Sequence, residues 1–244
     1  MIAAWRAEFQ KMATVKGQWI SAILCAMAIP VFSFLVVATG GLGPGETSTT
    51  GAVTGSIAGL LAFGVWAAAI TAGEYAQGTM VTSLSTVPRR SRLFAAKLSA
   101  IAAAATVGAL VSVIVAFLVT LGVRAHGSYG LGNPALMVGV LIAVIAVAVI
   151  GTTVGLLTRS PTASIVIVVA ALLLPKLAAN LLGGLQPWVV GASPSQVISE
   201  VAGGLRLPDN QTFPAGPWLA ALTMVLVAVA VAVAGALAFA RRDG

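Results

Sequence analysis

Apolar residues fill six long, nearly uncharged stretches of this chain, and most of the polar residues lie between them. The stretches cover residues about 19–39, 52–71, 98–121, 135–157, 161–182 and 217–240. A membrane-crossing helix needs about 20 apolar residues at a rise of about 1.5 Å per residue, and each stretch meets that length. The runs are continuous rather than alternating, which does not fit a β-barrel. The pattern therefore predicts an all-α polytopic membrane protein with six transmembrane helices.

Composition agrees with a single transmembrane domain that covers residues 1–244. Hydrophobic residues make up 59% of the chain and charged residues only 8%. A soluble domain usually carries about a quarter charged residues, so this composition excludes an ordinary soluble enzyme. The six stretches leave no room for an appended soluble domain.

The basic residues indicate how the chain crosses the membrane. If the N-terminus is cytoplasmic, ten of the thirteen lysines and arginines fall on the cytoplasmic side. Arg124 and Arg206 then lie outside, and Lys176 lies within a span. This positive-inside bias predicts that both termini are cytoplasmic. The expected location is the plasma (cytoplasmic) membrane. The bias also accounts for the net charge of +7, so nucleic acid is not an expected partner.

Residues 1–18 have the pattern of an amphipathic helix. Ile2, Trp5, Phe9 and Met12 recur at helical spacing and share one face. Such a helix can lie flat on the inner membrane surface, with its apolar face in the lipid and its basic residues near phosphates. The alternative is a cytoplasmic extension of the first transmembrane helix.

The connection at residues 73–97 is the largest on the cytoplasmic side. Within it, residues 79–87 are mildly apolar but too short to cross a membrane, and Pro88 ends them. Ser91 offers an N-cap for the helix that continues into the third span. A short surface helix before a basic turn suits the docking of a cytoplasmic partner. The alternative is that the basic residues only anchor the topology.

The outer connection at residues 183–216 is too long to be structureless in a compact protein. Ser193 is placed as an N-cap, Pro194 as the first helical residue, and Gly203 as a stop signal. The sequence thus predicts a short helix in the outer interface of the membrane.

Motifs for enzymatic chemistry do not occur in the sequence. No lysine follows a glycine, as the last lysine of a phosphate-binding P-loop does. One histidine cannot form a zinc cluster, and no G-x-S-x-G nucleophile motif is present. We therefore expect no catalytic residue, no metal and no cofactor on this chain. If ATP and Mg²⁺ drive the protein, a separate polypeptide binds them.

Lys176 is the one ionisable residue well inside a predicted span, and Asn180 follows it one helical turn later. Charged groups within a membrane commonly mark the path of a substrate. A lysine near the end of a span can instead extend its ammonium group to the lipid headgroups, or pair within the protein. Both interpretations of Lys176 and Asn180 stay open.

The cytoplasmic connection resembles a known transporter family. Its sequence contains Glu74-Tyr75-Ala76-Gln77-Gly78-Thr79, then Pro88-Arg89-Arg90-Ser91-Arg92, and then Lys97. These residues look like the first cytoplasmic loop of ABC-2 type transporter permeases. A glutamate, a Gly-Thr pair, a proline, a basic cluster and a lysine recur there in this order. The six helices, the inside termini and the amphipathic N-terminal helix are similar too.

The resemblance implies a coupling helix at residues 78–87 that sits in a groove of a separate ABC ATPase subunit. It also implies a smaller second contact at residues 158–161, and a second permease copy or a related permease as membrane partner. The implied ATPase interface contains Glu74, Gly78, Thr79, Leu84, Pro88, Arg89, Arg90, Arg92 and Arg159.

The expected function is that of the transmembrane permease of an ATP-driven ABC-2 type exporter. The spans consist almost entirely of Ala, Val, Leu, Ile and Gly, which favours an amphipathic or lipid-like substrate over an ion or sugar. Two alternatives are a membrane channel or scaffold without a partner, and a small-molecule binding subunit of an energy-coupled importer.

Overall fold

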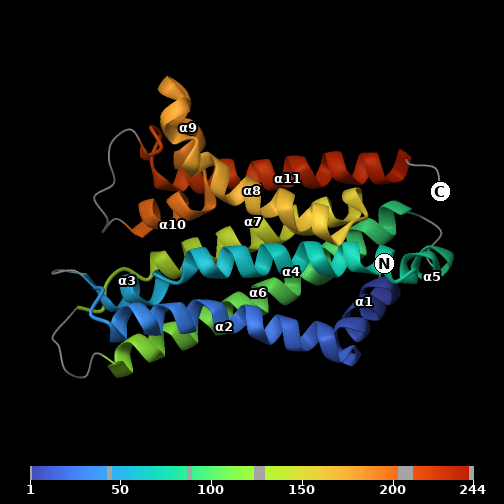
Figure 1. Ribbon diagram of the computed structural model, residues 1–244, viewed down its shortest axis with the longest axis horizontal. Coiled ribbons are helices and arrows are strands. Elements are labelled where there is room, and N and C mark those ends of the chain that lie inside the picture. The colour runs from blue at the N-terminus through green and yellow to red at the C-terminus, as the bar shows by residue number, and fades with distance from the viewer. Residues whose placement is uncertain (1, 43–45, 87–89, 124–129, 203–210, 242–244) are drawn as a thin grey trace.

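The computed structural model describes residues 2–42, 46–86, 90–123, 130–202 and 211–241. Long helices in these ranges run side by side as a bundle, and no strand occurs among them (Figure 1). The predicted all-α class is therefore confirmed. The α-helices are α1 Ile2–Thr14, α2 Lys16–Ala38, α3 Ser48–Val53, α4 Ser56–Ala76, α5 Thr79–Thr86, α6 Arg90–Val123, α7 Ala135–Thr158, α8 Pro161–Leu177, α9 Gln186–Gly191, α10 Pro194–Ala202 and α11 Pro217–Arg241.

Five helical segments of the described chain are long and apolar enough to cross a membrane. They are Lys16–Ala38, Ser48–Ala76, Arg90–Val123, Ala135–Thr158 and Pro217–Arg241. The fifth predicted stretch, 161–182, is helical only to Leu177 and then turns into short 3₁₀ segments. Pro175 weakens the last turn because it has no backbone N–H to donate. With 17 residues, α8 is about 26 Å long, so a sixth crossing stays a prediction.

The second predicted stretch, 52–71, is not one uninterrupted helix. It begins earlier, as α3, and is broken between Val53 and Ser56 before α4 continues to Ala76. At the break, the Gly55 N–H donates to Ser33 Oγ of α2 (3.2 Å), and the Ser33 hydroxyl donates to the Ala52 carbonyl (2.9 Å). A Cβ at Gly55 would meet the backbone carbonyl of Ile29, so glycine permits this close approach of α2.

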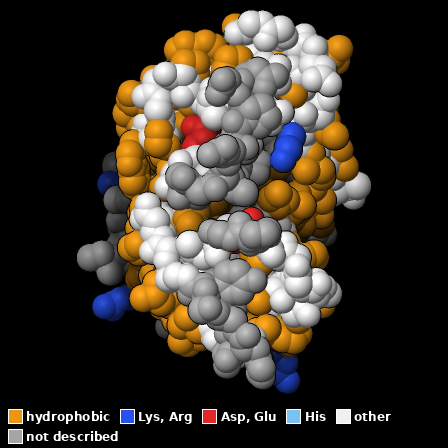
Figure 2. Space-filling view, turned by 90° about the vertical axis from the view of Figure 1, so that its left-hand side faces the viewer, with side chains coloured by type: hydrophobic (Ala, Val, Ile, Leu, Met, Phe, Trp, Pro, Cys, Tyr) orange, Lys and Arg blue, Asp and Glu red, His pale blue; other side chains and the backbone are white. Residues whose placement is uncertain are grey.

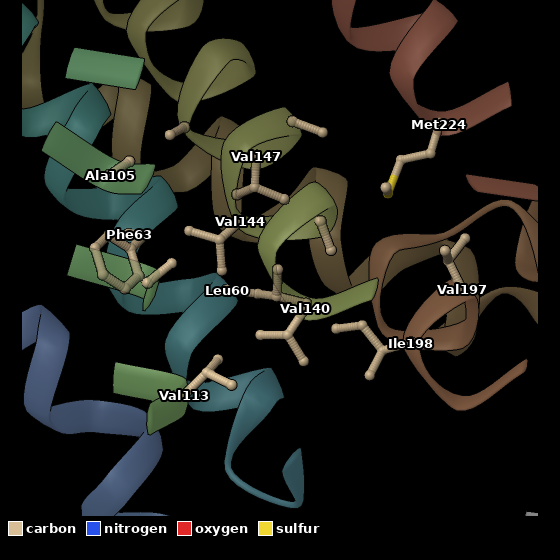
Figure 3. Close-up of a cluster of buried hydrophobic side chains, with 14 of the residues drawn as sticks. Leu60, Phe63, Ala105, Val113, Val140, Val144, Val147, Val197, Ile198 and Met224 are labelled. Atoms are coloured by element: carbon tan, nitrogen blue, oxygen red, sulfur yellow. The ribbon is translucent and has the colours of Figure 1, made fainter. Parts of the chain in front are cut away.

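Helix α7 lies in the centre of the bundle and packs against α4, α6, α10 and α11. Figure 3 shows Val140, Val144 and Val147 of α7 among Leu60 and Phe63 of α4. All five side chains are 2% exposed or less. Apolar side chains thus fill the centre of a single copy of the chain.

Gly151 lets α7 approach the backbone of α4. A Cβ at Gly151 would lie 2.5 Å from the Gly64 carbonyl oxygen and 3.3 Å from Ala67 Cβ. Gly151→Ala should therefore lower the free energy of unfolding by about 1–3 kcal/mol, because two packed helices must separate. Thermal unfolding in a mild detergent measures the change. The control is Gly122→Ala in α6, where a Cβ meets nothing within 4 Å. Equal unfolding temperatures for the two variants would contradict this account.

The two ends of the bundle carry different helices. One end, called the α5 end here, carries α1, α5 and the last turn of α11 (Figure 1). The opposite end, the α10 end, carries α3, α9 and α10. In the described residues that Figure 2 shows at the α10 end, hydrophobic side chains surround the rim and charged side chains are few. The scarcity of charged side chains at the α10 end fits a cytoplasmic α5 end, although the sidedness itself stays a prediction.

Helix α10 begins at Pro194, directly after Ser193. Its apolar residues Val197 and Ile198 are 0% and 2% exposed and pack into the core (Figure 3). The helix thus forms part of the bundle instead of only resting in the outer interface. Glu200 accepts a hydrogen bond from the Phe213 N–H (2.8 Å). Burial raises the pKa of Glu200, and the hydrogen bond from Phe213 opposes that rise.

Candidate functional site

Helix α5 leaves the end of α4 through a tight turn. Gly78 has a φ of +71°, in the left-handed region that glycine adopts without the steric cost of a Cβ. Next to it, the Thr79 hydroxyl donates to the Glu74 carbonyl (3.3 Å). The turn directs α5 away from the axis of α4 at the α5 end of the bundle (Figure 1).

One side of α5 is anchored in the bundle by Met80, which is 2% exposed. Met80 belongs to a small apolar cluster with Leu93 and Phe94 of α6, Leu156 of α7 and Phe239 of α11. A displacement of α5 would therefore act directly on three long helices.

The other side of α5 is open. Val81 is 71% exposed, and Thr82 and Ser85 are exposed on the same helical face. A valine surrounded by small hydroxyl side chains, with no charged residue between Thr79 and Thr86, suits a contact that becomes desolvated. Among the described residues, Val81, Thr82 and Ser85 thus form an open face of α5.

A buried ionic cluster lies beside α5, formed by Glu8 and Lys11 of α1, Glu74 of α4 and Lys97 of α6. The Lys97 side chain is 1% exposed, and its Nζ lies 2.6 Å from both Glu74 carboxylate oxygens and 2.9 Å from Glu8 Oε2. Lys11 Nζ lies 3.0 Å from Glu8 Oε1 and 3.8 Å from Glu74 Oε1. The two positive and two negative side chains neutralise each other, and a charge buried in a protein needs such a partner.

The ionic cluster also reaches α5. Lys11 donates to Ser83 Oγ at 2.8 Å, and Ser83 is itself buried. Side chains of α1, α4, α5 and α6 are thus joined at one place. Trp5 and Phe9 of α1 stay 37% exposed, so part of the apolar face of α1 is free to contact lipid.

The connection between α7 and α8 lies next to the end of α4. Arg159 caps α7 with a φ of +57°, and its exposed guanidinium lies 5.5 Å from the centre of the Tyr75 ring. A cation over a ring face at this distance is attracted to it. Arg159 is therefore held at the α5 end, near the turn that starts α5.

The structure brings most of the predicted interface residues to the α5 end. Gly78, Thr79, Arg92 and Arg159 are exposed there, and Arg90 is partly exposed. Glu74 differs from the expectation: it is 8% exposed and faces Lys97, so it belongs to the ionic cluster rather than to the open surface. Pro88, Arg89 and the side chain of Leu84 lie outside the described residues.

Lys176 and Asn180 lie elsewhere, towards the α10 end. Both side chains are exposed, at the end of α8 and in the 3₁₀ turn that follows. Lys176 lines a small cavity with Leu60, Leu172 and Ser195. In the described residues no ion pair involves Lys176, so its contribution to a substrate path stays a prediction.

Several residues of the site were not predicted individually, among them Glu8, Lys11, Met80 and Val81. Glu8 and Lys11 are three positions apart on α1, and such a pair is common on helices that only face water. Met80 and Val81 are ordinary members of a mildly apolar segment. Across the described ranges, no group of three or more His, Cys, Asp or Glu side chains is placed to hold a metal ion.

Comparison with protein families gives one clear finding. The model of the ABC-2 family transporter protein matches residues 4–175, well over half of the chain. The matched stretch contains the ionic cluster, α5 and Arg159, and nearly all of α8. Comparison with curated proteins gives no match.

Proposed function

The chain belongs to the ABC-2 family of transporter proteins, and from this premise we propose that it is the transmembrane permease of an ATP-driven exporter. A separate ABC ATPase subunit would bind ATP and Mg²⁺ and dock on the exposed face of α5. The observation that carries this proposal is the two-sided placement of α5. Val81 is open at 71% exposure, whereas Met80, on the adjacent side, is fixed among three long helices.

The contacts of α5 suggest how ATP hydrolysis could move the permease. A partner that tilts α5 would displace Met80, and with it the ends of α6, α7 and α11. Through Ser83 and Lys11 the same tilt would reach α1 and the ionic cluster. Packed helices shift as rigid bodies, so a small movement at α5 can rock the bundle.

The filled centre of the bundle favours a path between two permease copies over a channel through one. Val140, Val144 and Val147 of α7 occupy the middle of the bundle (Figure 3). In contrast, α2 presents large exposed apolar side chains such as Leu24, Phe32 and Leu35. A second copy, or a related permease, could cover this face and enclose an amphipathic substrate with it.

Gentle extraction of the tagged chain from membranes tests this function. We expect a soluble ATPase subunit and a second permease to be recovered with it, and the complex to hydrolyse ATP. A monomer without partners, obtained in several mild detergents, would contradict the proposal and favour a channel or scaffold.

The sidedness of the α5 end can be tested separately. In a Cys25→Ala background, a cysteine replaces either Ser91 in α6 or Ala215 before α11, and both positions are exposed. We predict that an impermeant thiol reagent labels the Ala215 variant in intact cells and the Ser91 variant only after lysis. The reverse pattern would place α5 outside the cell and remove the coupling role.

A further inference from the structure

A cavity of about 690 Å³ opens between α2 and α4 beside the end of α1. Cavities of about 300–1,000 Å³ are typical sites for small molecules. Towards the middle of both helices the walls are mostly apolar, with Leu24, Cys25, Ala62, Val65 and Ile70. Towards the α5 end the lining becomes polar, with Gln18, Ser21, Gln77, Thr79 and Thr82. The cavity thus has the polarity of an amphiphile, an apolar body with a polar end.

Two polar atoms on side chains that line this cavity lack a hydrogen-bond partner in the described residues. The Trp66 side chain, in a residue 5% exposed, has an Nε1–H donor without an acceptor. Gln18 Oε1, on the facing helix, is a buried acceptor without a donor. Buried polar groups are nearly always hydrogen-bonded, so each such exception points to a missing partner. Hydroxyl groups can supply either bond, since a hydroxyl both accepts and donates.

The charges in the lining are already neutralised. Lys11 and Glu74 are the charged residues among those that line the cavity. Lys11 pairs with Glu8 at 3.0 Å, and Glu74 pairs with Lys97 at 2.6 Å. A phosphate or carboxylate on the ligand would find no unpaired cation here, so the lining favours an uncharged head group.

We propose that this cavity binds an amphiphile with one acyl chain and an uncharged, hydroxyl-bearing head group, as in a monoacylglycerol. The acyl chain lies against the apolar wall, and hydroxyl groups of the head group accept from Trp66 and donate to Gln18. The role of this ligand as cargo rests on the function proposed above, whereas its binding to the cavity does not.

The single cysteine of the chain reports occupancy of the cavity. Cys25 lines it and is only partly exposed, with Sγ 3.4 Å from the Ala62 carbonyl oxygen. The purified chain in nanodiscs is titrated with 1-monoolein, and the rate of maleimide labelling at Cys25 is measured. We expect labelling to slow several-fold and to reach a plateau. The half-protecting concentration is the 1-monoolein concentration that gives half of the full protection. In Trp66→Phe it should rise about fivefold, which corresponds to the typical contribution of one hydrogen bond.

Matched controls separate this site from a general effect on the bilayer. Phenylalanine keeps an aromatic ring beside Phe63. Trp188→Phe, at a half-exposed residue near the α10 end, removes an indole N–H away from the cavity and should change nothing. A cysteine at lipid-exposed Leu226, in a Cys25→Ala background, should label at the same rate with and without 1-monoolein.

Three outcomes would overturn the proposal: protection without a plateau, equal protection by ionised oleate, or an unchanged half-protecting concentration in Trp66→Phe. If 1-monoolein protects Cys25 saturably but the chain recruits no ATPase, the proposed site stands and the transporter function is overturned instead. If the chain couples to an ATPase but 1-monoolein does not protect Cys25, the transporter function stands and the proposed site is overturned.

Discussion

Replacing Lys97 with methionine should lower the free energy of unfolding by about 3–5 kcal/mol, the usual cost of leaving a buried charge without its partner. The Lys97 ammonium lies between Glu74, at 2.6 Å, and Glu8, at 2.9 Å. Without it, two carboxylates remain close together, and only Lys11, whose side chain is 36% exposed, balances them. Methionine fills nearly the same space as lysine, so the lower free energy of unfolding comes from the missing charge and not from a cavity.

Thermal and denaturant unfolding in a mild detergent measure this effect. Arg92→Met, on an exposed arginine of the same helix five residues earlier, is the matched control and should change stability by no more than about 0.5 kcal/mol. A triple variant, Lys97→Met with Glu8→Gln and Glu74→Gln, should recover much of the loss because no buried charge remains unpaired. If Lys97→Met is as stable as Arg92→Met, the cluster does not hold the α5 end together.

The fold class and the family could be predicted because their signal is spread over long stretches of sequence. A continuous apolar run such as 135–157 identifies a transmembrane helix without knowledge of its neighbours. The order of Glu74, Gly78-Thr79, the basic cluster after Pro88 and Lys97, together with the helix pattern of the whole chain, indicated the ABC-2 permeases, and the family match confirms that interpretation.

The ionic cluster could not be predicted, because its members come together only in the folded bundle. Lys97 is 23 residues from Glu74 and 89 from Glu8 along the chain. On α1, Glu8 lies on the polar side of an amphipathic helix, where a glutamate in water gives the same pattern. The docking of α1 against α6 is what buries it.

The sequence did not predict helix ends that depend on contacts with a neighbouring helix. The break before α4 depends on Ser33 of α2, whose hydroxyl takes over backbone hydrogen bonds at Ala52 and Gly55. The hydropathy pattern does not predict this break, because Gly, Ser and Thr occur throughout the spans. Helix α8 ends at Leu177, shortly after Pro175, although the apolar residues Leu181 and Leu182 lie beyond it. The proline, rather than a loss of apolar residues, therefore accounts for this helix end.

The open face of α5 leads to the second large effect that we expect. Val81→Asp should abolish the association with the ATPase subunit, or weaken it by at least tenfold, while membrane insertion and thermal stability stay unchanged. Val81 is 71% exposed in the permease alone, so an aspartate there costs the fold little. In a contact that excludes water, an unpaired carboxylate costs about 2–5 kcal/mol, which is well above a tenfold change in affinity.

Val81 is a better position for this experiment than Gly78, which precedes α5. The φ of +71° at Gly78 disfavours every other residue, so a bulky side chain there would strain the turn as well as obstruct a partner. Val81→Trp adds bulk on the open face without that strain, and Thr14→Asp places the same charge on an exposed position of α1. Co-purification and ATP hydrolysis by the reconstituted complex are measured for all three variants. We expect both Val81 variants to lose ATPase association and transport-coupled hydrolysis, and Thr14→Asp to retain them. If hydrolysis and export survive both changes at Val81, α5 is not the element that couples the ATPase to the membrane helices.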